Sequence, residues 1–399
     1  MSSSTVYPDQ RVGVGGSSAG TADQAATEAV RAALGGRRPS ADDLVLIFPT
    51  VDYDPHEFLR AACREAGDAR VLGCSSFGWL TGAAQGTMGC SAAYLPAAGL
   101  SFGVAVADSL GSDLYAVARE TTQTARARAG AGHPHNTLLV LSDGLAGDQR
   151  EVMRGCYAAA GAAVPVIGGS AGENLTQVAT YQYGEERVLT NGLVVIWIGS
   201  PTPVGVGTAH GWSPVGDTMI VTRADGNVIH ELDGRPAAEV YFDKRATVTG
   251  DHTQPGAGEQ FLAGSVMDGP LGLPTAAGRF DVRHILGPTD DGGLAMFGYV
   301  SDHSVVQIMR SEPADLIAAA GAAATAAAAR LTSAPRGSLV FGCTARAGLL
   351  GEPGMRAETD AITGALAGVP TCGFYTYGEF ARISGSTGFH NASVAVLAL

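Results

Sequence analysis

Residues 44–80, "LVLIFPTVDYDPHEFLRAACREAGDARVLGCSSFGWL", contain the pattern that decides the fold. An apolar run is followed by a helix start, with Asp54 as N-cap, Pro55 at the first helical position and Glu57 completing a capping box. Apolar residues then recur at helical spacing, and a second apolar run ends in a glycine loop. The segment therefore predicts a βαβ-like unit.

Two later segments repeat this order. Residues 137–175, "TLLVLSDGLAGDQREVMRGCYAAAGAAVPVIGGSAGENL", carry the same cap at Asp148 and Glu151. Residues 337–380, "GSLVFGCTARAGLLGEPGMRAETDAITGALAGVPTCGFYTYGEF", have a longer loop before the helix. This repetition predicts a duplicated βαβ-like element, in one continuous sheet or in two packed sheets.

The chain is expected to be an α/β protein of two domains, each built from these units with mixed sheets flanked by helices. Gly and Pro concentrate at residues 200–215, which predicts an N-terminal domain over 25–205 and a C-terminal domain over 206–399. Residues 1–24 are Ser/Gly-rich and are expected to form a flexible tail. Residues 246–293 are expected to be a long irregular excursion.

Composition excludes several classes of function. Of 399 residues, 46% are hydrophobic and 16% charged, which suits a packed core. The net charge of −13 argues against nucleic acid and anionic membranes as partners. With no signal peptide and no apolar run of about 20 residues, we expect a cytoplasmic protein. None of the six cysteines forms a C-x-x-C pair, which argues against a zinc knuckle or a thioredoxin-like motif. The histidines show no H-E-x-x-H spacing, and we expect no metal site.

Residues 370–380, "PTCGFYTYGEF", are the first candidate for a binding site. Alternation places Tyr375 and Tyr377 on one face of a strand end, and Glu379 after Gly378 can accept hydrogen bonds from an ammonium group. The alternative is a turn whose tyrosines pack in the core and whose glutamate caps a neighbouring backbone.

Residues 341–351, "FGCTARAGLLG", are the second candidate. Cys343 and Arg346 follow an apolar strand, where ligands of α/β proteins bind. Arg346 suits a carboxylate and can also lower the pKa of Cys343 to give a reactive thiolate. The alternatives are a buried cysteine and a structural ion pair between Arg346 and Glu379.

The glycine loops after the first two units are a third candidate, because backbone N–H groups in such loops can face an anion. Neither matches a phosphate-binding or dinucleotide-binding fingerprint, and close packing of strand and helix is the alternative. The candidate residues are Gly73, Cys74, Ser75, Gly168, Gly169 and Gly172.

Together these motifs resemble the FIST family. The first half carries "GCSSFG", "LSDGL" and "VIGGSAGEN" in the family's order, and the second carries "FGCTARAGLLG", "GFYTYGEF" and "HNASVAVLAL". The resemblance covers residues 30–399 and implies an N-terminal and a C-terminal FIST domain. It also implies an intracellular sensory, signal-transduction module that binds a small, amino-acid-like ligand. Some members are thought to hold haem and respond to nitric oxide.

On this resemblance we expect a non-catalytic pocket in the C-terminal domain. Its residues are expected to be Cys343, Arg346, Tyr375, Tyr377, Gly378 and Glu379, with Asn391 nearby. No output domain is fused to the matched region, so a separate signalling protein is the expected partner.

Two alternatives stay open. One is a haem-dependent nitric-oxide sensor whose axial ligand is His210 or His390. The other is an enzyme that uses Cys343 as nucleophile or Glu379 as general base.

Overall fold

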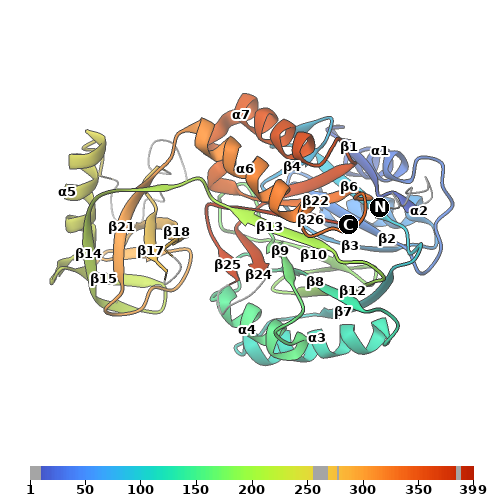
Figure 1. Cartoon of the computed structure of the whole chain (residues 1–399), viewed down its shortest axis with the longest axis horizontal. Coiled ribbons are helices and arrows are strands. Elements are labelled where there is room, and N and C mark those ends of the chain that lie inside the picture. The colour runs from blue at the N-terminus through green and yellow to red at the C-terminus, as the bar shows by residue number, and fades with distance from the viewer. Residues whose placement is uncertain (1–9, 255–267, 276–277, 383–387) are drawn as a thin grey trace.

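The computed structural model describes residues 10–254, 268–275, 278–382 and 388–399. They form two parts, which we call the body and the lobe (Figure 1). The body contains three six-stranded sheets, and the lobe contains an eight-stranded sheet with one helix. The lobe is an insertion within the chain that forms the third sheet of the body.

The three predicted units each supply the parallel strand pair of one body sheet. These pairs are β2 (Leu44–Pro49) with β3 (Arg70–Cys74), β8 (His135–Ser142) with β9 (Val166–Ser170), and β22 (Ser338–Cys343) with β23 (Thr371–Thr376). The helix between each pair is α2 (Pro55–Ala66), α4 (Gln149–Ala160) or α7 (Thr344–Ala365). The side chains of Asp54 and Asp148 cap α2 and α4, so the βαβ prediction is confirmed.

Two antiparallel strands complete each unit beside its parallel pair. They are β1 (Gly13–Ser17) and β6 (Cys90–Leu95), β7 (Ser101–Ala107) and β12 (Leu193–Ser200), and β13 (Gly205–Ala209) and β26 (Val394–Ala398). A second helix packs beside the first in each unit, and these helices are α1 (Ala22–Leu34), α3 (Leu114–Ala129) and α6 (Pro313–Ala328). Each helix pair covers the outer face of its own sheet (Figure 1).

The three units exchange hairpins in a closed cycle. The hairpins are β4 (Gly78–Thr81) with β5 (Gln85–Gly86), β10 (Gln182–Gly184) with β11 (Arg187–Leu189), and β24 (Gly378–Arg382) with β25 (Phe389–His390). The first unit adds its hairpin to the third sheet, the second to the first sheet, and the third to the second sheet. All three sheets therefore have the same strand order, and the body has pseudo-threefold topology.

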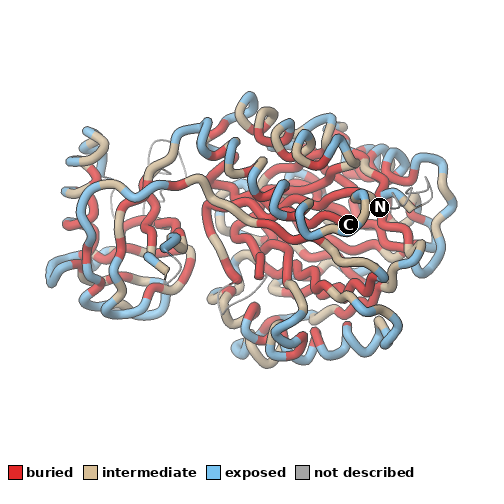
Figure 2. The backbone as a smooth tube through the Cα atoms, in the orientation of Figure 1, coloured by how far each residue is buried: buried red, intermediate tan, exposed pale blue. Residues whose placement is uncertain are grey.

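A single core joins the inner faces of the three sheets (Figure 2). Phe48 of β2 stacks on Phe374 of β23 with ring centroids 4.5 Å apart, and Phe341 of β22 meets the same ring edge-on. Buried apolar residues from all three units meet in this core, so none of the units has an inner core of its own.

The lobe follows β13 and returns to α6. Its elements are β14 (Ser213–Asp225), β15 (Val228–Leu232), β16 (Arg235–Pro236), α5 (Ala237–Thr249), β17 (Leu271–Pro274), β18 (Phe280–Arg283), β19 (Ile285–Pro288), β20 (Leu294–Met296) and β21 (Val305–Arg310). It has its own apolar core, which includes Val221, Tyr241 and Leu294. A turn at Asp225 and Gly226 joins β14 to β15 in a hairpin.

Two expectations need correction. Residues 10–24 are not all tail, because Gly13–Ser17 form a strand and α1 begins at Ala22. Small residues allow this, since a Cβ at Gly13 or Gly15 would lie within about 2 Å of an α1 carbonyl oxygen. The region 246–293 is not wholly irregular either, because β17 and β18 form one hairpin there, β19 pairs with β20, and β17 also pairs with the more distant β21. Residues 1–9, 255–267, 276–277 and 383–387 lie outside the described part. No helix in the described ranges is both long and apolar enough to cross a membrane.

Candidate functional site

A small pocket lies where the lobe meets the carboxyl ends of β22 and β23, and we call it the junction pocket. Its walls are Leu175, His284, Phe297, Cys343, Thr344, Ala345, Thr376, Tyr377 and Asn391. His284 and Phe297 come from the lobe, and the other residues come from the body. The free volume is ≈ 10 Å³, which is room for roughly one water molecule.

Two buried polar side chains on its walls lack hydrogen-bond partners. His284 is 3% exposed and Asn391 is 1% exposed. Among the described residues, no group bonds to either imidazole nitrogen of His284 or to the side-chain oxygen and nitrogen of Asn391. An unsatisfied buried polar group costs about 1–3 kcal/mol, so these four atoms make the junction pocket the candidate site.

The polar groups of the junction pocket are uncharged at neutral pH. Burial lowers the pKa of His284 to about 4, so its imidazole is neutral. Burial, and secondarily the charge of Glu379, raise the pKa of the Cys343 thiol, while Arg346 lowers it by less. These directions favour the buried-cysteine alternative over a thiolate activated by Arg346, because desolvation outweighs the guanidinium charge.

Tyr377 is held in the pocket wall by a loop of the second unit. Its hydroxyl donates to Oε1 of Glu173 and accepts a hydrogen bond from the backbone N–H of Leu175 at 3.1 Å. Glu173 is 1% exposed, and its carboxylate also accepts from the backbone N–H groups of Thr176 and Gln177. Glu173 thus fixes both the loop and the tyrosine. Glu173 belongs to the motif "GGSAGEN", but no spacing in the sequence indicates that its side chain contacts Tyr377.

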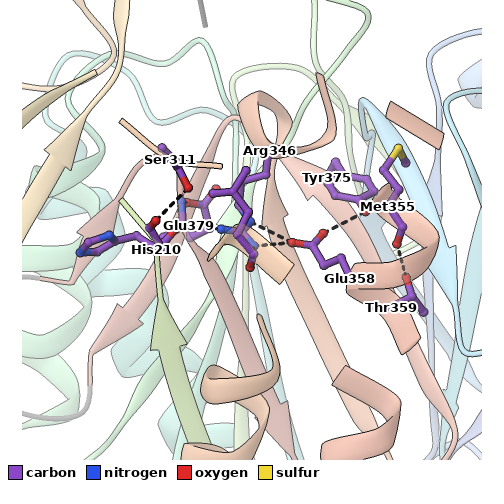
Figure 3. Close-up of polar contacts among 12 residues, drawn as sticks. His210, Ser311, Arg346, Met355, Glu358, Thr359, Tyr375 and Glu379 are labelled. Carbon is purple, nitrogen blue, oxygen red and sulfur yellow. Dashed lines mark hydrogen bonds and ion pairs between the residues drawn. The ribbon is translucent and has the colours of Figure 1, made fainter. Parts of the chain in front are cut away.

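Arg346 belongs to a separate buried network (Figure 3). Its Nε lies 2.9 Å and its Nη2 2.5 Å from Oε1 of Glu358, and both side chains are essentially inaccessible. The guanidinium also donates to the carbonyl oxygens of His210 and Leu316. The hydroxyl of Tyr375 lies 3.2 Å from Oε2 of the same glutamate.

Neither Arg346 nor Tyr375 lines the junction pocket. The ion pair considered for Arg346 exists, but its partner is Glu358 of the long helix α7 and not Glu379. The structure therefore does not bring a carboxylate-binding arginine and an ammonium-binding glutamate together in one pocket.

Glu379 is buried on β24, behind the junction pocket. Its carboxylate accepts from the hydroxyl of Thr376 at 2.9 Å, and from the backbone N–H and hydroxyl of Ser393 at 3.1 and 2.7 Å. Burial raises its pKa to about 8, and the Ser393 and Thr376 hydrogen bonds oppose that rise. It joins β24 to the segment before β26 and does not face the pocket as a general base would.

The candidate glycine-loop residues lie where the units meet. Ser75 donates from its hydroxyl to the carbonyl of Gly172 at 2.8 Å, and Gly172 donates from its N–H to the carbonyl of Ser75 at 3.0 Å. Cys74 is fully buried, and burial raises its pKa. These contacts join the first unit to the second and leave these three residues outside the pocket.

The remaining candidate glycines permit close backbone or ring approach. A Cβ at Gly73 or Gly168 would lie 1.9 Å from the carbonyl oxygen of Ile47 or Val140, and one at Gly169 would lie 2.6 Å from the Thr376 side chain. At Gly378 a Cβ would meet the ring of Phe389 at 2.3 Å. Their positions match the close-packing alternative.

Comparison with known sequences agrees with the motifs. A model of the FIST N domain matches residues 43–235, and a model of the FIST C domain matches residues 237–382. The chain belongs to the FIST family. The two FIST models meet inside the lobe, and the FIST N match begins after β1 and α1, so it includes the rest of the first unit, the second unit and the beginning of the third.

Relatives of this FIST protein occur in mycobacteria and archaea. An uncharacterized protein of Mycobacterium tuberculosis is 30% identical over 233 residues, which are 58% of this chain and 60% of the relative. One of Mycobacterium bovis is 29% identical over 246 residues, 58% of this chain and 59% of the relative. One of Methanocaldococcus jannaschii is 29% identical over 86 residues, 22% of this chain and 17% of the relative. The matches thus span about 60% of the first relatives, whose names assign no ligand.

The junction pocket, in the conformation described, has no room for a haem. His210 accepts a hydrogen bond from the backbone of Trp212, His390 contacts the carbonyl of Ala381 at 3.0 Å, and neither lines the junction pocket. His284 does line it, but a macrocycle needs far more than the ≈ 10 Å³ free there. Within the described ranges, no group of three or more potential metal ligands is found.

Proposed function

We propose that this FIST protein is a sensory protein that binds a small ligand in the junction pocket. The observation that carries the proposal is the set of four unpartnered polar atoms on His284 and Asn391. Native proteins rarely leave such atoms buried without a role. Here one residue comes from the lobe and the other from the body, so a ligand bonded to both would join the two parts.

The chemistry of the walls defines the part of the ligand that enters the pocket. A neutral imidazole offers one donor and one acceptor, and an amide side chain offers both as well. Phe297 and Tyr377, with ring centroids 5.9 Å apart, supply an apolar wall. These groups favour an uncharged polar group, such as an amide, over a bare carboxylate or ammonium. An amino-acid-like ligand, which the family resemblance implies, would enter by a neutral polar end.

Ligand entry requires the lobe to move relative to the body. The pocket residues His284, Asn391, Cys343 and Tyr377 are all at most 5% exposed. Opening the lobe gives access, and closing it completes the hydrogen bonds. A change in lobe position is a signal that a separate output protein can read.

Mass spectrometry of the purified protein, native and denaturing, tests for a retained ligand. Titration with amino acids that bear neutral, acidic and basic side chains then tests the ligand class. We expect a dissociable mass or saturable binding of amide-bearing compounds, and at least tenfold weaker binding by Asn391→Leu.

The stability of the unliganded variant separates a binding role from a structural one. Asn391→Leu removes two unsatisfied groups, so we expect its free energy of unfolding to rise by about 1–3 kcal/mol. The matched control is Asn136→Leu, which removes the acceptor of the Trp197 indole N–H and should destabilise the protein. No bound mass, no binding and a destabilised Asn391→Leu would together reject the proposal.

A further inference from the structure

A second cleft lies between helix α4 and the lobe, and we call it the arginine cleft. Its volume is ≈ 550 Å³, within the range of about 300–1,000 Å³ that holds small organic ligands. Arg150, Arg154 and Tyr157 line it from α4, Arg283 and Tyr299 line it from the lobe, and Phe389 lies beside them. It is distinct from the junction pocket, because Arg283 and its neighbour His284 line different cavities.

Arg283 is a buried cation without an anionic partner. It ends strand β18 and is 6% exposed. In the described part of the chain it forms no ion pair, its Nη1 donates to the carbonyl of Val282 at 2.9 Å, and its buried Nε has no acceptor. A buried charge is costly unless a counter-charge lies beside it. Burial lowers the pKa of Arg283, and the charge of Arg150 lowers it further, while the charges of Asp281 and Asp148 oppose this fall without forming an ion pair with it.

Two more arginines stand at the same cleft. Arg150 stacks on the ring of Tyr299, 3.8 Å from its centroid, and pairs with Asp148 at 2.7 Å. Arg154 pairs with Glu151, which also lines the cleft, at 2.6 Å. These two arginines thus have carboxylates from their own helix, whereas Arg283 has none. Among the described residues that line this cleft, the guanidinium that remains without an ion-pair partner is therefore that of Arg283.

We propose that the arginine cleft binds a small organic anion whose phosphate or carboxylate group sits on Arg283. A guanidinium presents donors in a planar fork that matches either group. Arg150 and Arg154 attract the anion at the cleft mouth, and its apolar part lies along Tyr157 and Phe389. The site is additional to the ligand of the junction pocket. Because its walls come from α4 and from the lobe, the bound anion also holds these parts together.

Calorimetric titration of the full chain with phenyl phosphate and with benzoate tests the proposal and tells the two head groups apart. We expect saturable binding of at least one, with the other weaker. Arg283→Gln should weaken that binding at least tenfold. The charge-matched control Arg64→Gln, on α2 and paired with Asp23, should leave it unchanged. Failure of both probes to bind at about 10 mM, a concentration that detects even weak binding, would overturn the site.

Thermal unfolding separates an anion site from a structural arginine. Without ligand, Arg283→Gln should unfold at the same or a higher temperature, because it removes an uncompensated buried charge. The wild type should gain stability with the bound probe, and the variant should not. Arg154→Gln changes an exposed side chain, so it should leave the fold intact. It should weaken binding of the probe about threefold. Undiminished binding of the probe by both Arg283→Gln and Arg154→Gln would refute the proposal. Asn391→Leu, which changes the junction pocket, should bind the anion normally.

Discussion

At the scale of single residues, Arg346 and Glu358 form the most deeply buried ion pair described, and it should be strongly required for stability. Both side chains are at most 1% exposed. Glu358→Gln would leave the guanidinium buried without a counter-charge, so we expect a loss of about 3–5 kcal/mol in the free energy of unfolding. Urea denaturation at pH 7 measures it.

The exposed pair of Arg235 and Glu239 provides the control for this prediction. Glu239→Gln should leave the urea midpoint unchanged, because a solvated ion pair contributes little. Equal midpoints for Glu358→Gln and the wild type would show that the network contributes little to folding. They would also reopen Arg346 as a functional residue.

The candidate site shows what local sequence reasoning can reach. Cys343, Tyr377 and Asn391 were predicted together from motifs, and all three line the junction pocket. The side chains of Arg346 and Glu379 suit the two charged groups of an amino acid, which is why the sequence favours them as ligand-binding residues. Residue type, however, does not determine the direction in which a side chain points. His284 and Phe297 could not be predicted, because they lie in a Gly- and Pro-rich region and reach the site through tertiary packing of the lobe.

At the scale of elements, three glycines occupy equivalent places in the three units. Gly73, Gly168 and Gly373 each lie in the second parallel strand of a unit, facing a residue of the first. A Cβ at any of them would lie within 2.2 Å of a carbonyl oxygen of that neighbouring strand. The sequence pattern places Gly73 and Gly168 in loops, whereas the structure shows that all three glycines permit parallel pairing.

Gly168→Ala should be the most damaging of these substitutions. Its Cβ would lie 1.9 Å from the carbonyl oxygen of Val140, and its φ of 144° disfavours any side chain. Steric overlap and backbone strain together predict a loss above about 3 kcal/mol, measurable by urea denaturation. Gly364→Ala, on an exposed face of α7 with no atom within 4 Å, should instead stabilise by about 0.5–1 kcal/mol. Similar effects of both substitutions would contradict the strand-contact explanation.

The elements were more predictable than their arrangement. Helix caps at Asp54 and Asp148 and alternating apolar runs are local signals, so the three βαβ units could be recognised. The cyclic hairpin exchange depends on contacts between distant segments, such as Gly378 with Ser170. No spacing in the sequence encodes such a pairing.

At the scale of the whole molecule, the lobe replaces a short connection. In the first two units the strand at the edge of the sheet leads to the next helix through the loops between Ser17 and Ala22 and between Ala107 and Leu114. In the third unit the corresponding connection contains the whole lobe. The lobe ends lie together, because Ser213 pairs with Arg310 across an antiparallel ladder and the hydroxyl of Ser311 donates to the carbonyl of Gly211. The core between the three sheets therefore contains no lobe residue, whereas Val282 and Met309 of the lobe pack into the outer core of the third unit beside α6 and α7.

Replacing residues 213–310 with a Gly-Asn turn should leave the body folded but remove both binding sites. The core that joins the three sheets contains no residue from β14 to β21, so cooperative urea unfolding and near-ultraviolet circular dichroism should persist. The junction pocket would lose His284 and Phe297, and the arginine cleft would lose Arg283. Titration of the shortened protein with the junction-pocket ligand and with phenyl phosphate should then show no binding. Retained binding of either would place its site wholly within the body, and loss of cooperative unfolding would show that the lobe is required for the body to fold.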